Sequence, residues 1–480
     1  MRVARLAAAA AGSLAIVTVP LAVTGIAPGG AHITRPAAAV ATAAGAAGPQ
    51  LRPGAVHARS AQAAPPTTAY CEQHFQIACF QASQLQQAYN LPALYHRGVD
   101  GRGQTIVIVD SFGSPTIAHD LSVFDQAFHL PAPPSMQVIQ PAGKVPPYKA
   151  SNSAMVGWAG ETTLDVEYAH TIAPAAKILL VETPVAETEG VTGFPQIVNA
   201  EKYVISHHLG GVISQSFSAT EETFNGKSSL MALRGAYQLA QRDGVTVLSA
   251  SGDSGAADVG LDEKTYYTDP VTSWPPSDPL VTGVGGTQLH LGANGQFAAP
   301  TVWNDTYDVP TNQFIFGNNG ANPLAGGGGR SVIFPRPSYQ EPVAGLTGSA
   351  RGVPDISMSG ACNGAVDVYQ SFPGQAAGWY PTCGTSEATP LFAGIVSLAG
   401  QVARHPLGLI NPALYTMSQN RLPGLVDVAQ GNNTVSFTQG GASHTVQGFS
   451  AGPGYDLASG VGTVNAPLFV PELAKLAGRR

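Results

Sequence analysis

The sequence predicts an α/β protein built on one doubly wound parallel sheet with helices on both faces. Three observations support this. The chain has 480 residues, of which 44% are apolar, so it can bury one large core. Beyond Ala69, short β-branched runs alternate with amphipathic stretches, which is the order of βαβ units. No internal repeat interrupts this order, so we expect one domain over residues 69–480.

The expected elements follow one another in the order that a parallel sheet requires. The strands are Thr105–Ser111, Lys177–Glu182, Gly211–Phe217 and Val245–Gly252. The helices between and after them include Asp120–Leu130, Ile197–His208, Leu230–Asp243 and Leu391–Ala403. Each strand is short and rich in β-branched residues, and each helical stretch has one apolar face.

The N-terminus has the pattern of a secretory signal peptide over residues 1–41. A basic start, Met1–Arg5, precedes the apolar stretch Leu6–Ala27, and Ala37–Ala41 offers small residues for cleavage. An uncleaved membrane anchor is the alternative, since the stretch is long enough to span a bilayer, but Pro20 interrupts it. We therefore expect a secreted, extracellular protein with no membrane contact once processed.

Residues 42–68 form an Ala/Pro/Gly-rich stretch with few large apolar side chains. Such a stretch cannot bury enough surface to offset its ordering entropy, so we expect it to be disordered, as a possible short propeptide.

The charge of the chain excludes nucleic acid as a partner. The first 70 residues hold five Arg and no acidic residue, so their removal changes the net charge from −7 to −12. An acidic surface repels phosphates, and the sequence has no stripe of Lys and Arg with interleaved aromatics. The protein is expected to act as a monomer.

Four cysteines form two close pairs, Cys71/Cys79 and Cys362/Cys383. Behind a signal peptide, this spacing predicts two intrachain disulfides within these pairs. Zinc is the alternative, but neither pair has Cys-x-x-Cys spacing and no histidine lies at a matching offset.

The candidate nucleophile is Ser386, in a Gly-Thr-Ser sequence that precedes a long apolar helix. We expect its side chain to face a solvent-filled cleft. Free backbone N–H groups at a helix N-terminus can stabilise negative charge on a substrate oxygen. By itself Gly-Thr-Ser is more often a helix cap, but Pro390 and Ala393-Gly394 complete the nucleophile pattern of subtilisin-like folds.

Two carboxylates, Glu161 and Asp165, lie four residues apart and share one helix face. Like charges at this spacing destabilise a helix unless both reach water, so a solvated face is the simpler interpretation. If both are buried they share a proton, one pKa rises, and a carboxylate becomes a competent base and later acid.

Asp253 directly follows the strand Val245–Gly252, where catalytic groups gather in open α/β sheets. An Asx turn between glycines is the alternative interpretation. Kept protonated, Asp253 could donate a hydrogen bond to an oxyanion.

Together these sites resemble the sedolisin, or serine-carboxyl, peptidase family, whose fold is a subtilisin-like doubly wound parallel sheet. The family's motifs are similar to five stretches that occur here in the same order: Glu161–Pro174, Gly252–Gly255, Trp274–Thr287, Arg351–Ser357 and Gly384–Pro390.

The resemblance implies a secreted, acid-acting serine endopeptidase that cleaves proteins or peptides. Ser386 would attack the carbonyl, Glu161 would take its proton, and Asp165 would orient Glu161. Asp253 would form the oxyanion hole with the Ser386 N–H, and Asp110, at the end of a strand, would extend the carboxyl network.

The resemblance also implies one structural Ca²⁺ near the C-terminus. Its ligands would be the carboxylates of Asp427 and Asp456 and the carbonyls of Val428, Gly452 and Gly454, which are the hard oxygens that Ca²⁺ prefers. Composition alone would make this a Gly-rich turn.

Two alternatives stay open. A conventional Ser-His-Asp subtilase would use His170 or another histidine, although His170 points away from the Asp165 face and is more often a hydrogen-bonded core residue. A secreted, inactive binding module with the same fold is the other, since family members carry a large folded pro-domain and only residues 42–68 separate the signal from the domain here.

Overall fold

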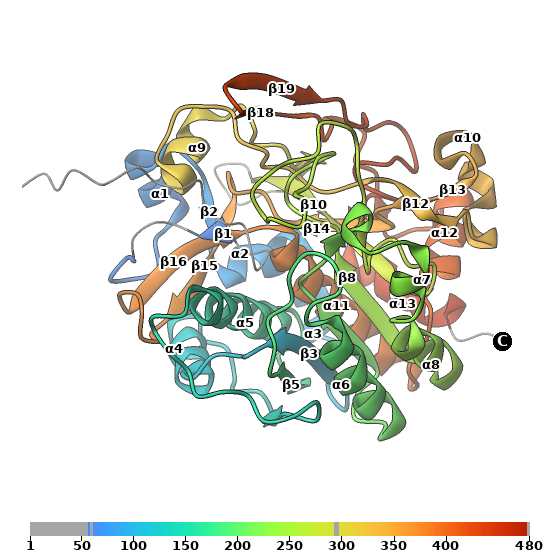
Figure 1. Ribbon diagram of the computed structural model, residues 1–480. Helices are drawn as coiled ribbons and strands as arrows, with labels where there is room; N and C mark the ends of the chain where they lie inside the picture. The colour runs from blue at the N-terminus through green and yellow to red at the C-terminus, as the bar shows by residue number, and fades with distance from the viewer. Residues whose placement is uncertain (1–55, 58–60, 292–296, 478–480) are drawn as a thin grey trace, which may run out of the picture. The chain divides into compact units, whose positions relative to one another are not determined.

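The computed structural model describes residues 56–57, 61–291 and 297–477, which form an α/β domain around an eight-stranded sheet (Figure 1). Seven strands run parallel, and only β11, at one edge, is antiparallel. The strands, in spatial order, are β11 (Phe297–Val302), β10 (Thr282–Leu291), β8 (Thr246–Ala250), β6 (Val212–Gln215), β3 (Thr105–Ser111), β5 (Lys177–Thr183) and β4 (Met136–Ile139), and β14 (Ile356–Ser359) also pairs with β10.

The sheet is covered on both faces, as predicted, because successive side chains of its strands point to opposite sides. In β3, Ile106 and Ile108 pack into the same core as α5 (Ser153–Ile172) and α11 (Thr385–Ala403). Val107 and Val109 pack into a second core with α6 (Phe194–Ser206) and α8 (Gly235–Asp243). The doubly wound parallel fold is therefore confirmed.

One predicted helix is divided in two. Leu230–Asp243 was expected to be continuous, but α7 (Lys227–Met231) ends within this range and α8 begins at Gly235. Arg234 lies in the break, where its guanidinium makes two hydrogen bonds, of 2.6 and 2.8 Å, to the buried carboxylate of Asp278. This ion pair with a distant segment fixes Arg234 at a point where local propensity alone favours a continuous helix.

The remaining elements surround this sheet. The helices are α1 (Thr68–His74), α2 (Ala82–Ala88), α3 (Pro92–Tyr95), α4 (Ile117–Phe128), η1 (Glu221–Thr223), α9 (Val309–Phe316), η2 (Ser338–Val343), α10 (Ala344–Thr347), α12 (Asn411–Gln419) and α13 (Ala466–Leu476). The short strands are β1 (Val56–His57), β2 (Cys79–Phe80), β7 (Ala219–Thr220), β9 (Ser273–Trp274), β12 (Gly329–Pro335), β13 (Ala350–Val353), β15 (Ala365–Gln370), β16 (Gly378–Cys383), β17 (Leu425–Val426), β18 (Val435–Gln439), β19 (Ala442–Val446) and β20 (Thr463–Val464).

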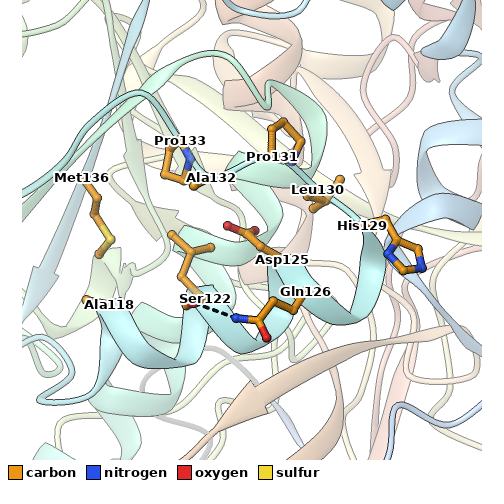
Figure 2. Close-up of a pocket in the computed structure, with 11 residues that line it drawn as sticks. Ala118, Ser122, Asp125, Gln126, His129, Leu130, Pro131, Ala132, Pro133 and Met136 are labelled. Carbon is orange, nitrogen blue, oxygen red and sulfur yellow. Dashed lines mark hydrogen bonds between the residues drawn. The ribbon is translucent and has the colours of Figure 1, made fainter.

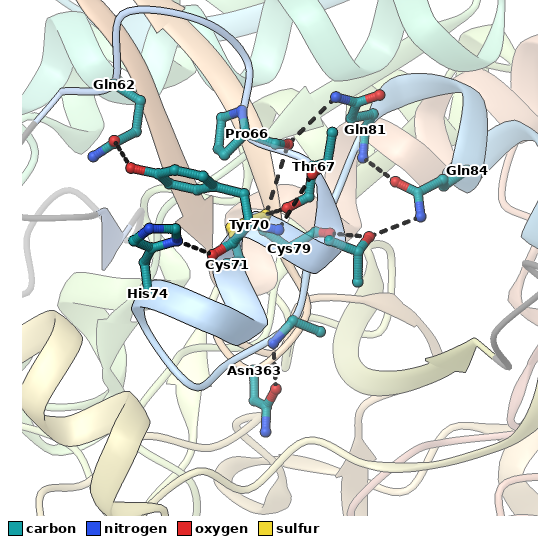
Figure 3. Close-up of a disulfide and its surroundings, with 12 residues drawn as sticks. Gln62, Pro66, Thr67, Tyr70, Cys71, His74, Cys79, Gln81, Gln84 and Asn363 are labelled. Atoms are coloured by element: carbon teal, nitrogen blue, oxygen red, sulfur yellow. Dashed lines mark hydrogen bonds between the residues drawn. A yellow bond between two sulfur atoms is a disulfide. The ribbon is translucent and has the colours of Figure 1, made fainter.

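Both predicted disulfides are present, with S–S distances of 2.04 Å for Cys71–Cys79 and 2.00 Å for Cys362–Cys383. The first closes α1 onto β2, where the Thr68 hydroxyl also donates to the Cys79 carbonyl at 2.7 Å (Figure 3). The second joins the loop before β15 to the last residue of β16, directly before the candidate nucleophile loop. Zinc coordination by these thiols is thereby excluded.

Described residues before residue 69 belong to the domain. β1 pairs with β16, and Gln62 exchanges backbone hydrogen bonds with Trp379, so the described part of residues 42–68 is ordered against the domain rather than disordered. Backbone pairing explains this, because it needs no large apolar side chains. The predicted signal peptide lies outside the described residues. Within the described ranges, no helix is long and apolar enough to cross a membrane.

Close contact between α5 and α11 depends on one glycine. A Cβ atom at Gly394 would lie 2.5 Å from the Cβ of Ile172, well inside van der Waals contact. Ile172 ends α5, and Gly394 lies in the middle of α11. The absent side chain therefore lets the two helices approach each other.

We expect Gly394→Ala to lower the free energy of unfolding by about 1–3 kcal/mol, since the added methyl group overpacks this contact. Gly345→Ala is the matched control, because Gly345 lies in a helix and a Cβ there meets nothing within 4 Å. That control should leave stability unchanged or raise it by up to about 1 kcal/mol. Urea unfolding measures both, and equal effects would contradict the close-contact account.

Candidate active site

Ser386 is the second residue of α11, immediately after the strand β16 and the turn at Gly384. Gly384 caps the helix with φ of 125°, a conformation that side-chain-bearing residues rarely adopt. The sequence therefore forces a sharp change from strand to helix one residue before Thr385. As predicted, Ser386 lies in the first turn of a helix, among its free backbone N–H groups.

The solvent exposure of Ser386 differs from the prediction. We expected a side chain in a solvent-filled cleft, but Ser386 is fully buried and its Oγ has no hydrogen-bond partner among the described residues. Neighbouring strand ends cover the first turn of α11. The Gly252 N–H donates to Thr385 Oγ1 at 3.1 Å, and Ser216 Oγ lies 3.4 Å from the Ser386 carbonyl oxygen, to which it can donate.

Asp253 follows β8 and faces the same helix turn. Its Oδ1 accepts hydrogen bonds from both the backbone N–H and the hydroxyl of Thr385, each at 2.7 Å. The Asx-turn interpretation is therefore wrong, because these donors are 132 residues away. Asp253 Oδ2 is buried and has no partner in the described part of the chain. Burial raises the pKa of Asp253 to about 7, although the two Thr385 hydrogen bonds act against that rise.

Glu161 and Asp165 lie in the middle of α5, and both are fully buried. The solvated-face interpretation is therefore wrong. From Trp158 to Ile172 every residue of this helix is buried, because α5 lies between the sheet, α11 and β15. Sequence spacing placed both carboxyls on one face but could not show that this face is inside the protein.

Burial is the main cause that raises the pKa of Asp165 well above its usual value, and the charges of Asp110 and Glu161 add to it. The Ser216 hydroxyl donates to Asp165 Oδ1 at 2.8 Å, which favours the charged form. One proton is therefore held among neighbouring carboxyls at a pH where an exposed carboxylate has none.

Asp110, the last residue but one of β3, lies beside this group. Burial raises the pKa of Asp110 to about 7; the nearby Thr162 hydroxyl opposes this rise and the charge of Glu182 adds to it. Since the charge of Asp110 also raises the pKa of Asp165, the two carboxyls are neighbours in this network.

Sequence reasoning missed three side chains of this site. Thr385 and Ser216 supply the hydroxyl donors to Asp253 and Asp165. Glu387, the residue after Ser386, is fully buried, and burial raises its pKa well above the usual value. An acidic residue in the first turn of an otherwise apolar helix was the signal that could have identified it.

His170 has the structural role that its position indicated. It is fully buried, and its Nε2 lies 2.8 Å from the carbonyl oxygen of Pro131. No described histidine forms a hydrogen bond with Ser386 Oγ. The geometry therefore gives a histidine base no support.

The candidate calcium ligands come together in one cluster of turns. Asp427 accepts from the Gly454 N–H at 3.1 Å, and Asp456 accepts from the Gly452 N–H at 3.1 Å. Ser459 Oγ lies near both Asp456 and the carbonyl oxygen of Val428. In the described ranges no three His, Cys, Asp or Glu residues gather as a metal site, so any ion here would need backbone carbonyls. The donor set of two carboxylates and three carbonyls fits Ca²⁺.

Comparison with known families agrees with this geometry. The sequence profile of the Subtilase family matches residues 150–440, which is more than half of the chain and includes Glu161, Asp165, Asp253 and Ser386. The chain belongs to the subtilase family.

This subtilase is similar to two curated relatives in particular. It is 32% identical to kumamolisin from Bacillus sp. (strain MN-32) over 387 residues, which cover 79% of the chain and 61% of kumamolisin. It is 30% identical to sedolisin from Pseudomonas sp. (strain 101) over 366 residues, which cover 75% of the chain and 56% of sedolisin. The chain thus spans about 60% of the length of these relatives.

Among solved structures, the subtilase resembles Pseudomonas sedolisin, a serine-carboxyl proteinase complexed with two molecules of pseudo-iodotyrostatin. The TM-score is 0.67 at 25% identity, and the match covers 83% of this chain and 99% of that one. The resemblance to sedolisins and the subtilisin-like fold, both predicted from the motifs, are confirmed.

The buried carboxyls predict a stability that falls as pH rises. The pKa of Asp110 is about 7 in the folded protein and about 3.9 in an unfolded chain, so its contribution is complete below about pH 4 and is lost towards pH 7. Asp110→Asn should remove up to about 1.4 kcal/mol per pH unit from the slope of unfolding free energy between pH 5 and 7.

Asp262→Asn is the control for this measurement. Hydrogen bonds, first from the Thr265 hydroxyl, lower the pKa of Asp262 to about 2, so it does not titrate in this window and its substitution should leave the slope unchanged. Urea unfolding at several pH values measures both variants. An unchanged slope in Asp110→Asn would show that Asp110 is already ionised in the folded protein.

Proposed function

We propose that this subtilase is a secreted, acid-acting serine endopeptidase that cleaves proteins or peptides. The observation that carries the proposal is the position of Ser386 in the first turn of a helix, among buried carboxyls and with no described histidine hydrogen-bonded to its Oγ. The two disulfides support secretion, since disulfides persist in extracellular surroundings. The similarity to kumamolisin and sedolisin over most of this chain supports the peptidase function.

In the proposed mechanism Ser386 Oγ attacks the scissile carbonyl and Glu161 takes its proton. Asp165 keeps Glu161 oriented and shares its proton, while the Ser216 hydroxyl holds Asp165 in place at 2.8 Å. Glu161 then returns the proton to the leaving amine. A carboxyl whose pKa is raised by burial and neighbouring acids can perform both steps in acid.

Asp253 would complete the oxyanion hole in its protonated form. Its Oδ1 is already occupied by two donors from Thr385, so a proton on Asp253 would lie on Oδ2, which has no partner in the described structure. The Oδ2–H and the Ser386 N–H would then donate to the oxyanion. Since the pKa of Asp253 is about 7, this donor is present in acid and is lost as pH rises through 7.

We also propose that Asp427, Asp456 and the carbonyls of Val428, Gly452 and Gly454 hold one structural Ca²⁺. The ion would tie the turn after β17 to the Gly-rich turn at 452–456, where each carboxylate now accepts backbone N–H groups. Without an ion, burial raises the pKa of Asp456, so binding is favoured at higher pH, where the carboxylate is ionised.

Digestion of a peptide library at pH 3 to 5, read by mass spectrometry, tests the proposed activity. The wild-type protein should cut internal peptide bonds, and Ser386→Ala should abolish cleavage while the protein stays folded, because the nucleophile is lost. Cleavage by pure Ser386→Ala would contradict the assignment, and a folded wild-type protein without cleavage would favour an inactive binding module.

Asp253→Asn and Asp253→Ala should differ. An asparagine amide can donate at the position of Oδ2 at any pH, so this variant should stay active and extend its activity above pH 7 relative to wild type. Asp253→Ala removes the donor and should lower kcat by about 10²–10³. Initial rates from pH 3 to 9 measure both effects, and equal losses would argue against the oxyanion role.

Removal of calcium should lower the melting temperature, and more at pH 7 than at pH 3, because ligand carboxylates must be ionised to bind metal. Calorimetry with and without EDTA measures this shift. Asp427→Asn should lower the melting temperature in the absence of EDTA and abolish the further shift. If EDTA does not change the melting temperature of the wild-type protein, the proposed calcium site is wrong.

A further inference from the structure

A pocket of about 890 Å³ lies between helix α4 and the turn that follows it (Figure 2). None of its lining residues belongs to the candidate active site. Its walls are mostly apolar and come from both segments: Ala118, Leu121, Leu130, Pro131, Pro133 and Met136. A pocket of this size and lining suits a small organic ligand.

One carboxyl group, that of Asp125, lies among these apolar walls (Figure 2). Its side chain is only 8% exposed, and its Oδ1 has no hydrogen-bond donor in the described part of the protein. The nearest described cation-forming group is Nε2 of His170, at 3.3 Å. Oδ1 is closed off from solvent, so a ligand in the pocket would reach Oδ2, which has no donor among the described residues either. A carboxylate whose oxygens lack donors is unfavourable in an apolar wall, so this one is set to receive a hydrogen bond from a ligand.

His170 does not supply the missing hydrogen bond to Asp125. Its Nε2 lies 2.8 Å from the Pro131 carbonyl oxygen, which can only accept, so the Nε2–H donates there. The distance from Nε2 to Asp125 Oδ1 is longer, 3.3 Å, and Oδ1 is left without a donor in the described structure.

The other groups around Asp125 also favour the binding of a positively charged ligand. Asp125 lies in the last turn of α4, where the helix dipole is negative and no basic residue is present. Burial is the main cause that raises the pKa of Glu167 well above its usual value, and the charges of Asp120 and Asp125 add to it, so Asp125 has acidic neighbours. The pocket lining contains no Lys or Arg, and its one histidine, His129, is exposed.

We propose that this pocket binds an organic cation, a primary ammonium or a guanidinium group on an apolar stem. The cationic group would donate to Asp125, and the stem would pack against Leu121, Leu130 and Met136. Such a group could belong to a free amine or to a basic side chain of a polypeptide. The site is separate from the proposed peptidase chemistry, since His170 and Glu161 lie nine residues, or about 14 Å, apart along α5.

Isothermal titration calorimetry of the full chain tests this proposal with three probes. These are 4-phenylbutylamine, its neutral analogue 4-phenylbutanol, and N-acetyl-D-Phe-D-Lys amide, which carries the same cation on a peptide that resists cleavage. We expect one-to-one binding of a cationic probe and at least about tenfold weaker binding of the alcohol, because a charge-assisted hydrogen bond is lost. Binding of only the amine or only the peptide supports the proposal and shows whether the cation belongs to a free amine or to a polypeptide side chain.

Asp125→Asn should lower the affinity for the cationic probe by at least about tenfold. Asp243→Asn is the control: Asp243 is an exposed residue of α8, so its substitution should leave the affinity unchanged. If Asp125→Asn does not fold, Ser122→Trp replaces it, since Ser122 is an exposed residue at the pocket and a tryptophan there would fill it. Equal affinity for amine and alcohol, no binding of any probe, or binding that survives the pocket variants would overturn the proposal.

Discussion

The contact between α5 and α11 in the apolar core fixes where Glu161, Asp165 and Ser386 lie relative to one another. Gly394 allows the two helices to approach at Ile172. One helix carries Glu161 and Asp165, and the other begins with the nucleophile turn. Because the same packing excludes water, it places the carboxyls and Ser386 in a medium that penalises charge. The proposed chemistry and the predicted loss of stability in alkali therefore have one physical origin.

In the proposed mechanism, burial allows carboxylic acids to take the place of a histidine. In water a carboxylate is too weak a base to activate a serine. Desolvation and neighbouring acids raise the pKa of Asp165, and burial raises those of Asp110 and Asp253 to about 7. A protein that keeps several acids protonated gains stability in acid and loses it as they ionise. Activity and stability are thus expected to share the same mildly acidic range.

The sequence was sufficient to predict the fold class and both disulfides, because these depend on local periodicity and on spacing along the chain. It was also sufficient to place Ser386 at a helix N-terminus. Burial could not be predicted in the same way. Glu161 and Asp165 have the same i, i+4 spacing whether a helix face meets solvent or a partner helix, and only the packing on α11 distinguishes the two cases.

Other differences arose from contacts between distant segments. The break before α8 coincides with the ion pair between Arg234 and Asp278. The described residues before residue 69 are held by backbone pairing of β1 with β16. Thr385 and Ser216 became part of the site only when the fold brought them to Asp253 and Asp165. None of these partners is near the other in sequence, so no local pattern could indicate them.

In the proposed mechanism, buried carboxyls and not a histidine supply the acid–base chemistry. The most direct test is the pH dependence of kcat/KM for an internally quenched peptide, measured on wild type, Glu161→Gln and His170→Gln, with folding checked by circular dichroism. The account predicts a wild-type maximum in acid, a loss of about 10²–10⁴ in Glu161→Gln, and retained activity in folded His170→Gln. A maximum at neutral or alkaline pH that disappears in His170→Gln and survives in Glu161→Gln would contradict it.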